Sequence, residues 1–133
     1  AGRCGRPMAR AEMAYVGVDV GTGSARAGVF DVRGQLLGEA SCDIRMRTPQ
    51  PEHCEQSSQD IWQACCRAVR GALESSGVAQ DNVGGVAFDA TCSLVVLGAD
   101  DRPLAVGADL PDEPGAEAGD LVFDVVVWCD HRA

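Results

Sequence analysis

The chain has 133 residues, 46% of them hydrophobic and 23% charged, and its formal net charge is −9. This length and composition are typical of one globular domain with a hydrophobic core. Because so acidic a surface cannot neutralise a phosphate backbone or bind anionic lipids, the charge argues against nucleic-acid and membrane partners.

The first residues look unlike the rest of the chain. Residues 1–12 are rich in glycine, arginine and alanine and show no periodicity, so we expect a disordered leader ahead of a domain that covers 13–133. They contain no apolar segment of the kind found in signal peptides, and no later apolar run approaches the length of a membrane span.

A β-hairpin is expected directly after the leader. Apolar residues alternate along both of its strands, at Val16, Val18, Val20, Ala25, Ala27 and Val29. This period of two is typical of half-buried strands. The hairpin carries Asp19 near the end of its first strand and Arg26 just beyond the turn.

The turn of this hairpin has the groups that bind a polyphosphate. Gly21 and Gly23 on either side of Thr22 allow positive φ angles and expose backbone amides, and Thr22 and Ser24 add hydroxyls. Amide donors suit an anion, and a nearby carboxylate suits Mg²⁺. An ordinary tight hairpin with solvated charges remains the alternative.

Two better-known glycine loops do not fit this turn. A P-loop has a lysine after its last glycine, and this turn has none. A dinucleotide-binding loop opens a helix, whereas residues 24–31 alternate like a strand.

A meander and a crossover helix follow. A third strand is expected over 36–45, and prolines break the pattern at 48–51. Ser57 then predicts a helix start, with Asp60 completing a capping box, and Gly77 predicts the helix end. Small residues on the apolar face predict close packing on the sheet, and Trp62 is expected to anchor the core.

The remaining elements are short. Three strands and a returning segment are expected, over 83–88, 94–97, 121–128 and 104–106. Residues 107–120 are acidic and hold two prolines, which indicates a solvated surface loop. Because the sequence stops just after an apolar strand, we expect a truncated chain.

The seven cysteines include an adjacent pair and show no C-x-x-C spacing. A disulfide framework or a zinc site would have regular paired spacing. We therefore expect reduced thiols and a cytoplasmic protein. Cys54 beside His53 is a weaker alternative as a metal-binding pair.

Polar clusters follow three of the predicted strands, at 19–26, 89–93 and 128–132. The first suits phosphate and Mg²⁺, the second offers a carboxylate and hydroxyls, and the third combines an indole with charged side chains. Because α/β sheets bind ligands beyond their strand ends, we expect the clusters to converge on one cleft. The alternative is that the later two clusters only cap turns and form surface ion pairs.

Four segments in order resemble the amino-terminal domain of the FGGY carbohydrate kinases. They are GVDVGTGSARAGVFD, the stretch from Pro51 to Trp62 with EQSSQDIW, GVAFDATCSLVVL, and VWCDHRA. The resemblance covers about nine tenths of the chain, from residue 14 to residue 133. It implies an α/β fold, an actin-like (ribonuclease-H-like) ATPase domain with a mixed sheet, a three-strand meander and flanking helices.

The resemblance also implies a reaction. It implies ATP-dependent phosphorylation of a sugar or polyol, with a pentulose such as D-ribulose as the expected substrate. Asp19 would organise Mg²⁺ through water, and Arg26 would approach the transferring group. The phosphates would lie on Gly21, Thr22, Gly23 and Ser24. Such positioning and charge neutralisation is most of what phosphoryl transfer needs.

On the sugar side, the resemblance places Ala90 and Thr91 along the substrate site and Trp128 against the sugar. Asp130 and Arg132 would support that aromatic wall. Residues 55–56 and the helix after them are assigned to structure.

The chain also departs from the family pattern. The general base, the adenosine-binding segment and the second domain of these kinases have no counterpart in it, so we expect this chain alone to be inactive. A homodimer of the longer protein is left open. The alternative from another class is a truncated, non-catalytic product that acts at most as a weak binding or interaction module. A third alternative, an actin-like ATPase such as a chaperone, would lack the sugar wall.

Overall fold

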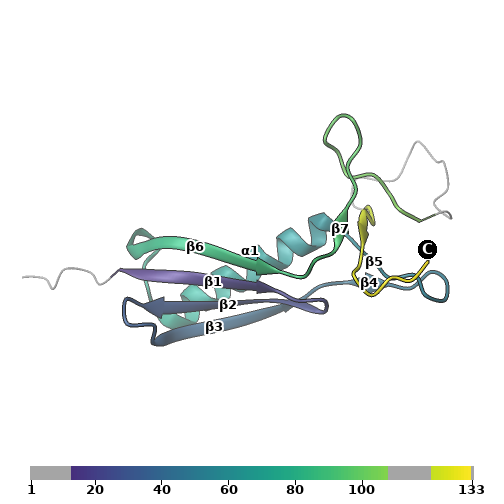
Figure 1. Cartoon of the computed structure of the whole chain (residues 1–133). Helices are drawn as coiled ribbons and strands as arrows, with labels where there is room; N and C mark the ends of the chain where they lie inside the picture. Colours follow the sequence, from purple (N-terminus) through teal and green to yellow (C-terminus); the bar gives the residue numbers. More distant parts are fainter. Residues whose placement is uncertain (1–12, 108–120, 133) are drawn as a thin grey trace, which may run out of the picture.

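The computed structural model describes residues 13–107 and 121–132. Its larger sheet has four strands in the order β3-β2-β1-β6 (Figure 1). They are β1 (Ala14–Val20), β2 (Ser24–Asp31), β3 (Leu36–Asp43) and β6 (Val83–Ala90). The first three form the predicted antiparallel meander, and β6 pairs with β1 in parallel. The sheet is therefore mixed, as the resemblance implied.

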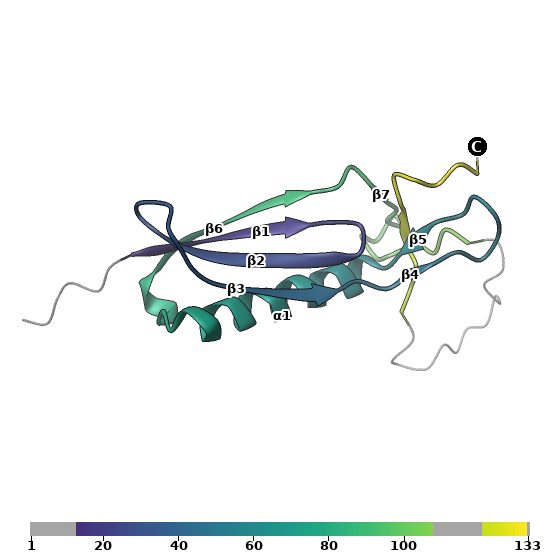
Figure 2. The ribbon, with the colours of Figure 1, turned by 90° about the horizontal axis from the view of Figure 1, so that it is seen from below.

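The predicted helix forms between the meander and β6. It is α1 (Ser58–Ser76), with Ser57 as N-cap and Gly77 as C-cap in the left-handed conformation at φ 67°. Figure 2 shows α1 lying along one face of the larger sheet. A short 3₁₀ helix, η1 (Gln80–Asn82), leads into β6.

Two glycines allow the helix to approach the sheet closely. A Cβ atom at Gly71 would come within 2.9 Å of the Ala40 Cβ, and one at Gly38 would come within 2.4 Å of the Ser76 backbone. The core between the two layers consists mainly of valine and alanine side chains of β1, β2 and α1. The predicted close packing through small residues is thus confirmed.

A second sheet of two-residue strands lies beyond the end of β1 where the hairpin turns (Figure 1). Its order is β4-β5-β8-β7, with all neighbours antiparallel. The strands are β4 (Met46–Arg47), β5 (Glu55–Gln56), β8 (Val125–Val126) and β7 (Leu94–Val95). This sheet brings together three stretches of chain that are far apart in sequence.

Three expectations need correction. Trp62 does not anchor the core but is 62% exposed, because it lies to one side of the buried stripe that Ala64, Ala68 and Ala72 form along α1. The capping box is half formed: Ser57 Oγ accepts from the Asp60 amide, but the Asp60 carboxylate binds Arg45 instead.

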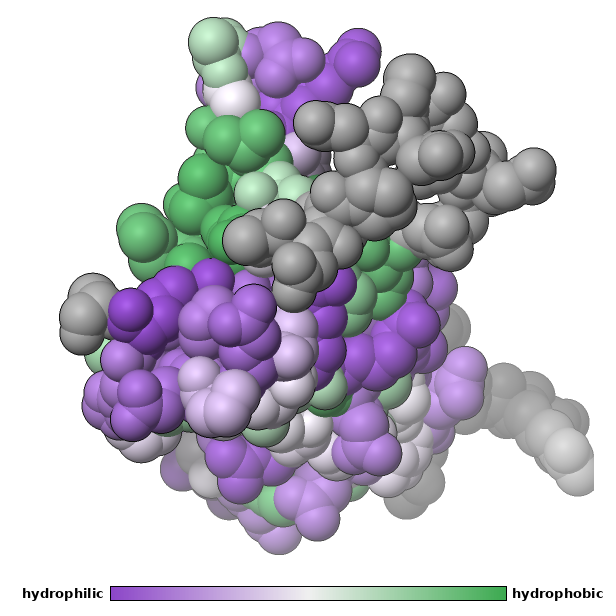
Figure 3. Space-filling view, turned by 90° about the vertical axis from the view of Figure 1, so that its right-hand side faces the viewer, coloured by the Kyte–Doolittle hydropathy of each residue, from purple (hydrophilic) through white to green (hydrophobic). Residues whose placement is uncertain are grey.

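The later strands are also shorter than predicted, since only 94–95 and 125–126 are in strands. The segment after β7 folds back and pairs with 96–97, as predicted. The Leu104 amide donates to the Val96 carbonyl, and Leu97 forms a bridge with Pro103. Figure 3 shows apolar surface on the projecting arm that this segment forms. The expected leader, 1–12, and most of the expected acidic loop lie outside the described residues.

Within the described part of the chain, no helix combines the length and the apolar character that a membrane crossing needs.

Candidate active site

Three charged side chains form a row across the larger sheet near the hairpin turn. Asp19 of β1 is opposite Arg26 of β2 and beside Asp89 of β6. All three project from the face opposite α1, because Val18 and Val20 on either side of Asp19 are buried toward the helix.

Asp19 and Arg26 form an exposed ion pair. Arg26 Nη2 lies 2.5 Å from Asp19 Oδ2, and their side chains are 62% and 53% exposed, respectively. Such exposed pairs contribute about 0–1 kcal/mol because water screens them. A bound cation or phosphate could therefore separate the two groups at little cost.

A hollow of about 460 Å³ lies on the same sheet face as this row. Small residues of three neighbouring strands, Gly17, Gly28 and Ala87, form its base, and Phe30 and Leu36 line its apolar side. The hairpin turn and Trp128 are not among its lining residues. Asp19, Arg26 and Asp89 also line the hollow, so the charged row borders it, whereas the turn residues and Trp128 lie beyond the strand ends.

In the hairpin turn, the carbonyls of Thr22 and Gly23 are occupied, and the amides of the same two residues are available. The Thr22 carbonyl accepts a hydrogen bond of 2.5 Å from Gln56 Nε2, and the Gly23 carbonyl accepts one of 3.0 Å from the Ile44 amide. No described residue accepts a hydrogen bond from the amides of Thr22 or Gly23. An anion could therefore bind these amides without breaking a protein hydrogen bond, which is the arrangement that a phosphate requires.

Trp128 lies directly against this turn. Its indole Nε1 donates to Thr22 Oγ1 at 2.9 Å, and its backbone amide donates to Ser93 Oγ at 3.3 Å. The ring is still 58% exposed, so a ligand can reach it. The first and third predicted clusters therefore meet at Thr22 and Trp128.

The second cluster continues from the end of β6. Ala90 is the last residue of this strand and is exposed. The amide of Thr91 extends the pairing by donating to the Val20 carbonyl at 3.1 Å. Both residues are therefore near the start of the hairpin turn, on the side of β1 away from β2.

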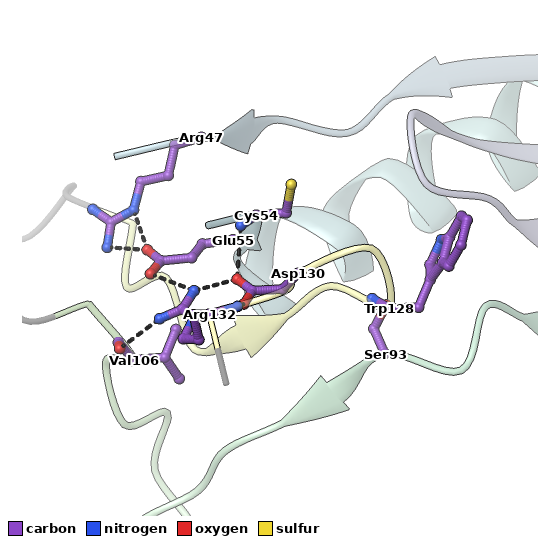
Figure 4. Close-up of polar contacts among 8 residues, drawn as sticks. All are labelled: Arg47, Cys54, Glu55, Ser93, Val106, Trp128, Asp130 and Arg132. Carbon is purple, nitrogen blue, oxygen red and sulfur yellow. Dashed lines mark hydrogen bonds and ion pairs between the residues drawn. The ribbon is translucent and has the colours of Figure 1, made fainter. Parts of the chain in front are cut away.

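The structure places Asp130 and Arg132 in a network of ions in the smaller sheet. Glu55, fully buried in β5, accepts hydrogen bonds from Arg47 Nε at 2.7 Å and from Arg132 Nη2 at 2.9 Å. Arg132 also binds Asp130, which in turn accepts from the Cys54 amide at 2.7 Å. Figure 4 shows the Trp128 ring pointing away from this network.

Within this network, Asp130 and Arg132 stabilise each other's charged forms. The hydrogen bond from Arg132 holds the pKa of Asp130 well below its usual range, and the same bond raises the pKa of Arg132. Both groups thus stay ionised and bound to each other. Asp130 also closes the turn that carries Trp128, because its amide donates to the Val127 carbonyl at 2.8 Å.

Gln56 is a contributor to the site that sequence reasoning had assigned only to structure. It is 2% exposed, and its side chain reaches the hairpin turn from β5. One signal for Gln56 was available in the sequence, its position directly before the N-cap Ser57. The start of a helix that packs on a sheet is close to the core, and a polar side chain buried there needs a hydrogen-bond partner. The sequence did not show which partner it would find.

Comparison with known proteins identifies the family. The N-terminal domain of the FGGY family of carbohydrate kinases matches residues 14–107. The chain is 45% identical over 122 residues to the human FGGY carbohydrate kinase domain-containing protein, covering 92% of this chain and 20% of that protein. It is 44% identical over 120 residues to a D-ribulokinase of Saccharomyces cerevisiae, covering 90% and 16%.

Solved structures agree on the fold. The xylulose kinase of Rhodospirillum rubrum superposes with a TM-score of 0.67 at 15% sequence identity, over 90% of this chain and 21% of that one. The fold is thus that of an actin-like ATPase domain. The chain spans about a fifth of the length of these relatives. On these grounds the chain belongs to the FGGY family of carbohydrate kinases and corresponds to its amino-terminal domain.

Proposed function

We propose that this chain is the amino-terminal part of a kinase that transfers the γ-phosphoryl group of ATP to a hydroxyl group of a sugar or polyol. The observation that carries the proposal is the meeting of the hairpin turn with Trp128 at the Thr22 hydroxyl. A turn with free amide donors and an exposed aromatic face lie next to each other there, as a phosphoryl donor and a sugar acceptor would require.

The turn and the charged row would hold the nucleotide. The amides of Thr22 and Gly23 and the Ser24 hydroxyl would bind phosphate oxygens. Gly21 would close the turn through its amide, which donates to the Ser24 carbonyl at 3.0 Å; it does so without the positive φ that its sequence position allows. Asp19 would hold Mg²⁺ through water. Arg26 would leave its ion pair with Asp19 and bind the transferring phosphoryl group. Mg·ATP supplies the phosphoryl group and neutralises part of its charge, and the protein contributes positioning and electrostatic stabilisation.

The sugar would lie between the end of β6 and Trp128. Ala90 and Thr91 are small and leave room for a polyhydroxylated ligand, and the exposed indole offers a face for C–H groups. Asp130 and Arg132 would keep the loop after β8 in place. A pentulose such as D-ribulose is the substrate we propose, supported by the identity of 44% to the yeast D-ribulokinase.

We assign no general base within this chain, and we expect the 133 residues alone not to catalyse transfer. We also propose a cytoplasmic location, because the cysteine spacing does not form a disulfide framework.

The test is an ADP-release assay on the protein encoded by the gene that contains this sequence. The panel is D-ribulose, other pentuloses, hexoses and glycerol, each with Mg·ATP. We expect the highest kcat/KM with a pentulose and a loss of at least about 100-fold in Asp19→Ala. Asp81→Ala, an exposed carboxylate of η1, serves as the matched control and should keep full activity.

Calorimetry on the 133-residue chain separates the proposal from the non-catalytic alternative. We expect weak Mg·ATP binding that Asp19→Ala removes and Asp81→Ala preserves. Equal binding by the wild type and Asp19→Ala would remove the metal assignment. No ADP release with any sugar or polyol would exclude the kinase activity.

A further inference from the structure

Thr22 lies where the proposed phosphate site meets the aromatic side of the proposed sugar site. We propose that Thr22 couples the two sites, so that a nucleotide on the turn and a sugar on Trp128 bind more tightly together than separately. This inference rests on the proposed function and adds to it a residue that sets the cooperation between the two ligands.

The orientation of Trp128 depends on Thr22. The backbone amide of Trp128 donates to Ser93 Oγ at 3.3 Å, whereas its exposed ring makes one polar contact with the described residues, to Thr22 Oγ1 at 2.9 Å. An indole has a single donor and no acceptor. When Thr22 accepts from that donor, the plane of the ring is fixed before a sugar arrives.

The same hydrogen bond sets the direction of the Thr22 hydroxyl. A hydroxyl has one proton, and when it accepts a hydrogen bond its own proton points elsewhere. With the indole on one side, the Thr22 proton is available to a phosphate oxygen on the other. Hydrogen bonds in such a chain polarise one another, so each ligand strengthens the contact that the other uses.

Hydrogen bonds to the rest of the protein hold the backbone at Thr22. Its carbonyl is held by Gln56, which is 2% exposed and belongs to β5, and the next carbonyl, of Gly23, is held by the Ile44 amide. The backbone of the turn is thus fixed from two directions. Removal of the hydroxyl should therefore change the coupling while leaving the turn in place.

The coupling is measured by calorimetry on the protein used in the ADP-release assay. The ligand is the magnesium complex of a non-hydrolysable β,γ-imido analogue of ATP. Its dissociation constant from the protein is determined with and without saturating D-ribulose. We expect the sugar to tighten nucleotide binding about two- to tenfold, the range that one hydrogen bond provides, and nucleotide to tighten sugar binding by the same factor.

Four variants test the residue. Thr22→Val, which keeps the shape and loses the hydroxyl, should reduce the factor to about one. Thr22→Ser, which keeps the hydroxyl, should retain it. Trp128→Phe keeps an aromatic ring without the donor and should also reduce the factor to about one. Thr48→Val, at an exposed threonine outside the site, should leave it unchanged.

The outcomes separate this inference from the proposed function. If the wild type phosphorylates a pentulose but Thr22→Val retains the coupling factor of the wild type, the inference is wrong and the kinase function stands. The inference also fails if Thr22→Ser loses the coupling as completely as Thr22→Val. If the wild type neither binds the analogue nor releases ADP, both are wrong.

Discussion

Arg132 donates a hydrogen bond to Glu55 at 2.9 Å, although 77 positions separate the two residues in the sequence. Glu55 is fully buried and also binds Arg47, so one carboxylate contacts two guanidinium groups. The chain after β8 is thereby tied to β5, the strand just before α1.

Glu55→Gln should strongly destabilise the protein. The substitution leaves the partly buried Arg47 without its carboxylate and leaves Arg132 with Asp130 as its one remaining ion-pair partner among the described residues. Removing one partner of a buried ion pair costs about 3–5 kcal/mol. Urea unfolding at neutral pH measures the loss.

The matched control is the exposed pair of Asp100 and Arg102, whose side chains are 63% and 84% exposed. Asp100→Asn should change the free energy of unfolding by less than about 0.5 kcal/mol. Equal losses in the two variants would show that burial does not set the strength of these pairs.

Stability should fall on acidification. The hydrogen bond from Arg132 lowers the pKa of Asp130, and a carboxyl whose folded pKa is below its unfolded pKa contributes stability above the unfolded pKa. That contribution is lost as the pH falls from about 4 toward the folded pKa. The urea midpoint should therefore fall between about pH 5 and pH 2, and less steeply in Asp130→Asn. A wild-type midpoint that stays constant over this range would contradict the assignment.

Gly71→Ala should destabilise the protein although alanine is the better helix former. The new Cβ would lie 2.9 Å from the Ala40 Cβ, so α1 must move off β3. We expect a loss of about 1–3 kcal/mol from overpacking. Ser75→Ala, on the exposed side of the same helix, should be neutral or stabilising by up to about 0.5 kcal/mol. A Gly71→Ala variant more stable than the wild type would mean that the helix has room at this point.

Trp62→Ala should have little effect on stability. The side chain is 62% exposed and does not belong to the core cluster, so we expect a change below about 1 kcal/mol in thermal unfolding. A loss of about 3–5 kcal/mol, as for a buried tryptophan, would restore its predicted role as a core anchor.

The hairpin and the helix could be predicted because their signals are local. Alternating valines fixed the faces of β1, and Ser57 and Gly77 marked both ends of α1. The smaller sheet could not be predicted, since strands such as Val125–Val126 have too few residues to show a period. These short strands form because segments far apart in the sequence pair with each other. The sequence of one segment does not indicate with which other segment it pairs.

The candidate site also has a part that local sequence predicts and a part that it does not. The residues of the hairpin turn were found from Gly21 and Gly23, which flank Thr22 in the sequence. The contact of Trp128 with Thr22 spans 106 positions and depends on how the smaller sheet is assembled. The resemblance to a family supplied both residues, but only the structure shows that they touch.

The four successive side chains from Glu55 in β5 to Ser58 at the start of α1 each make different contacts. Glu55 binds two arginines, Gln56 the hairpin turn, Ser57 the Asp60 amide and Ser58 the buried carboxylate of Asp124. An insertion or deletion of a single residue here would shift all four contacts at once. Evolution can vary the length of the exposed turn at 98–102, but it can change 55–58 only by substitution.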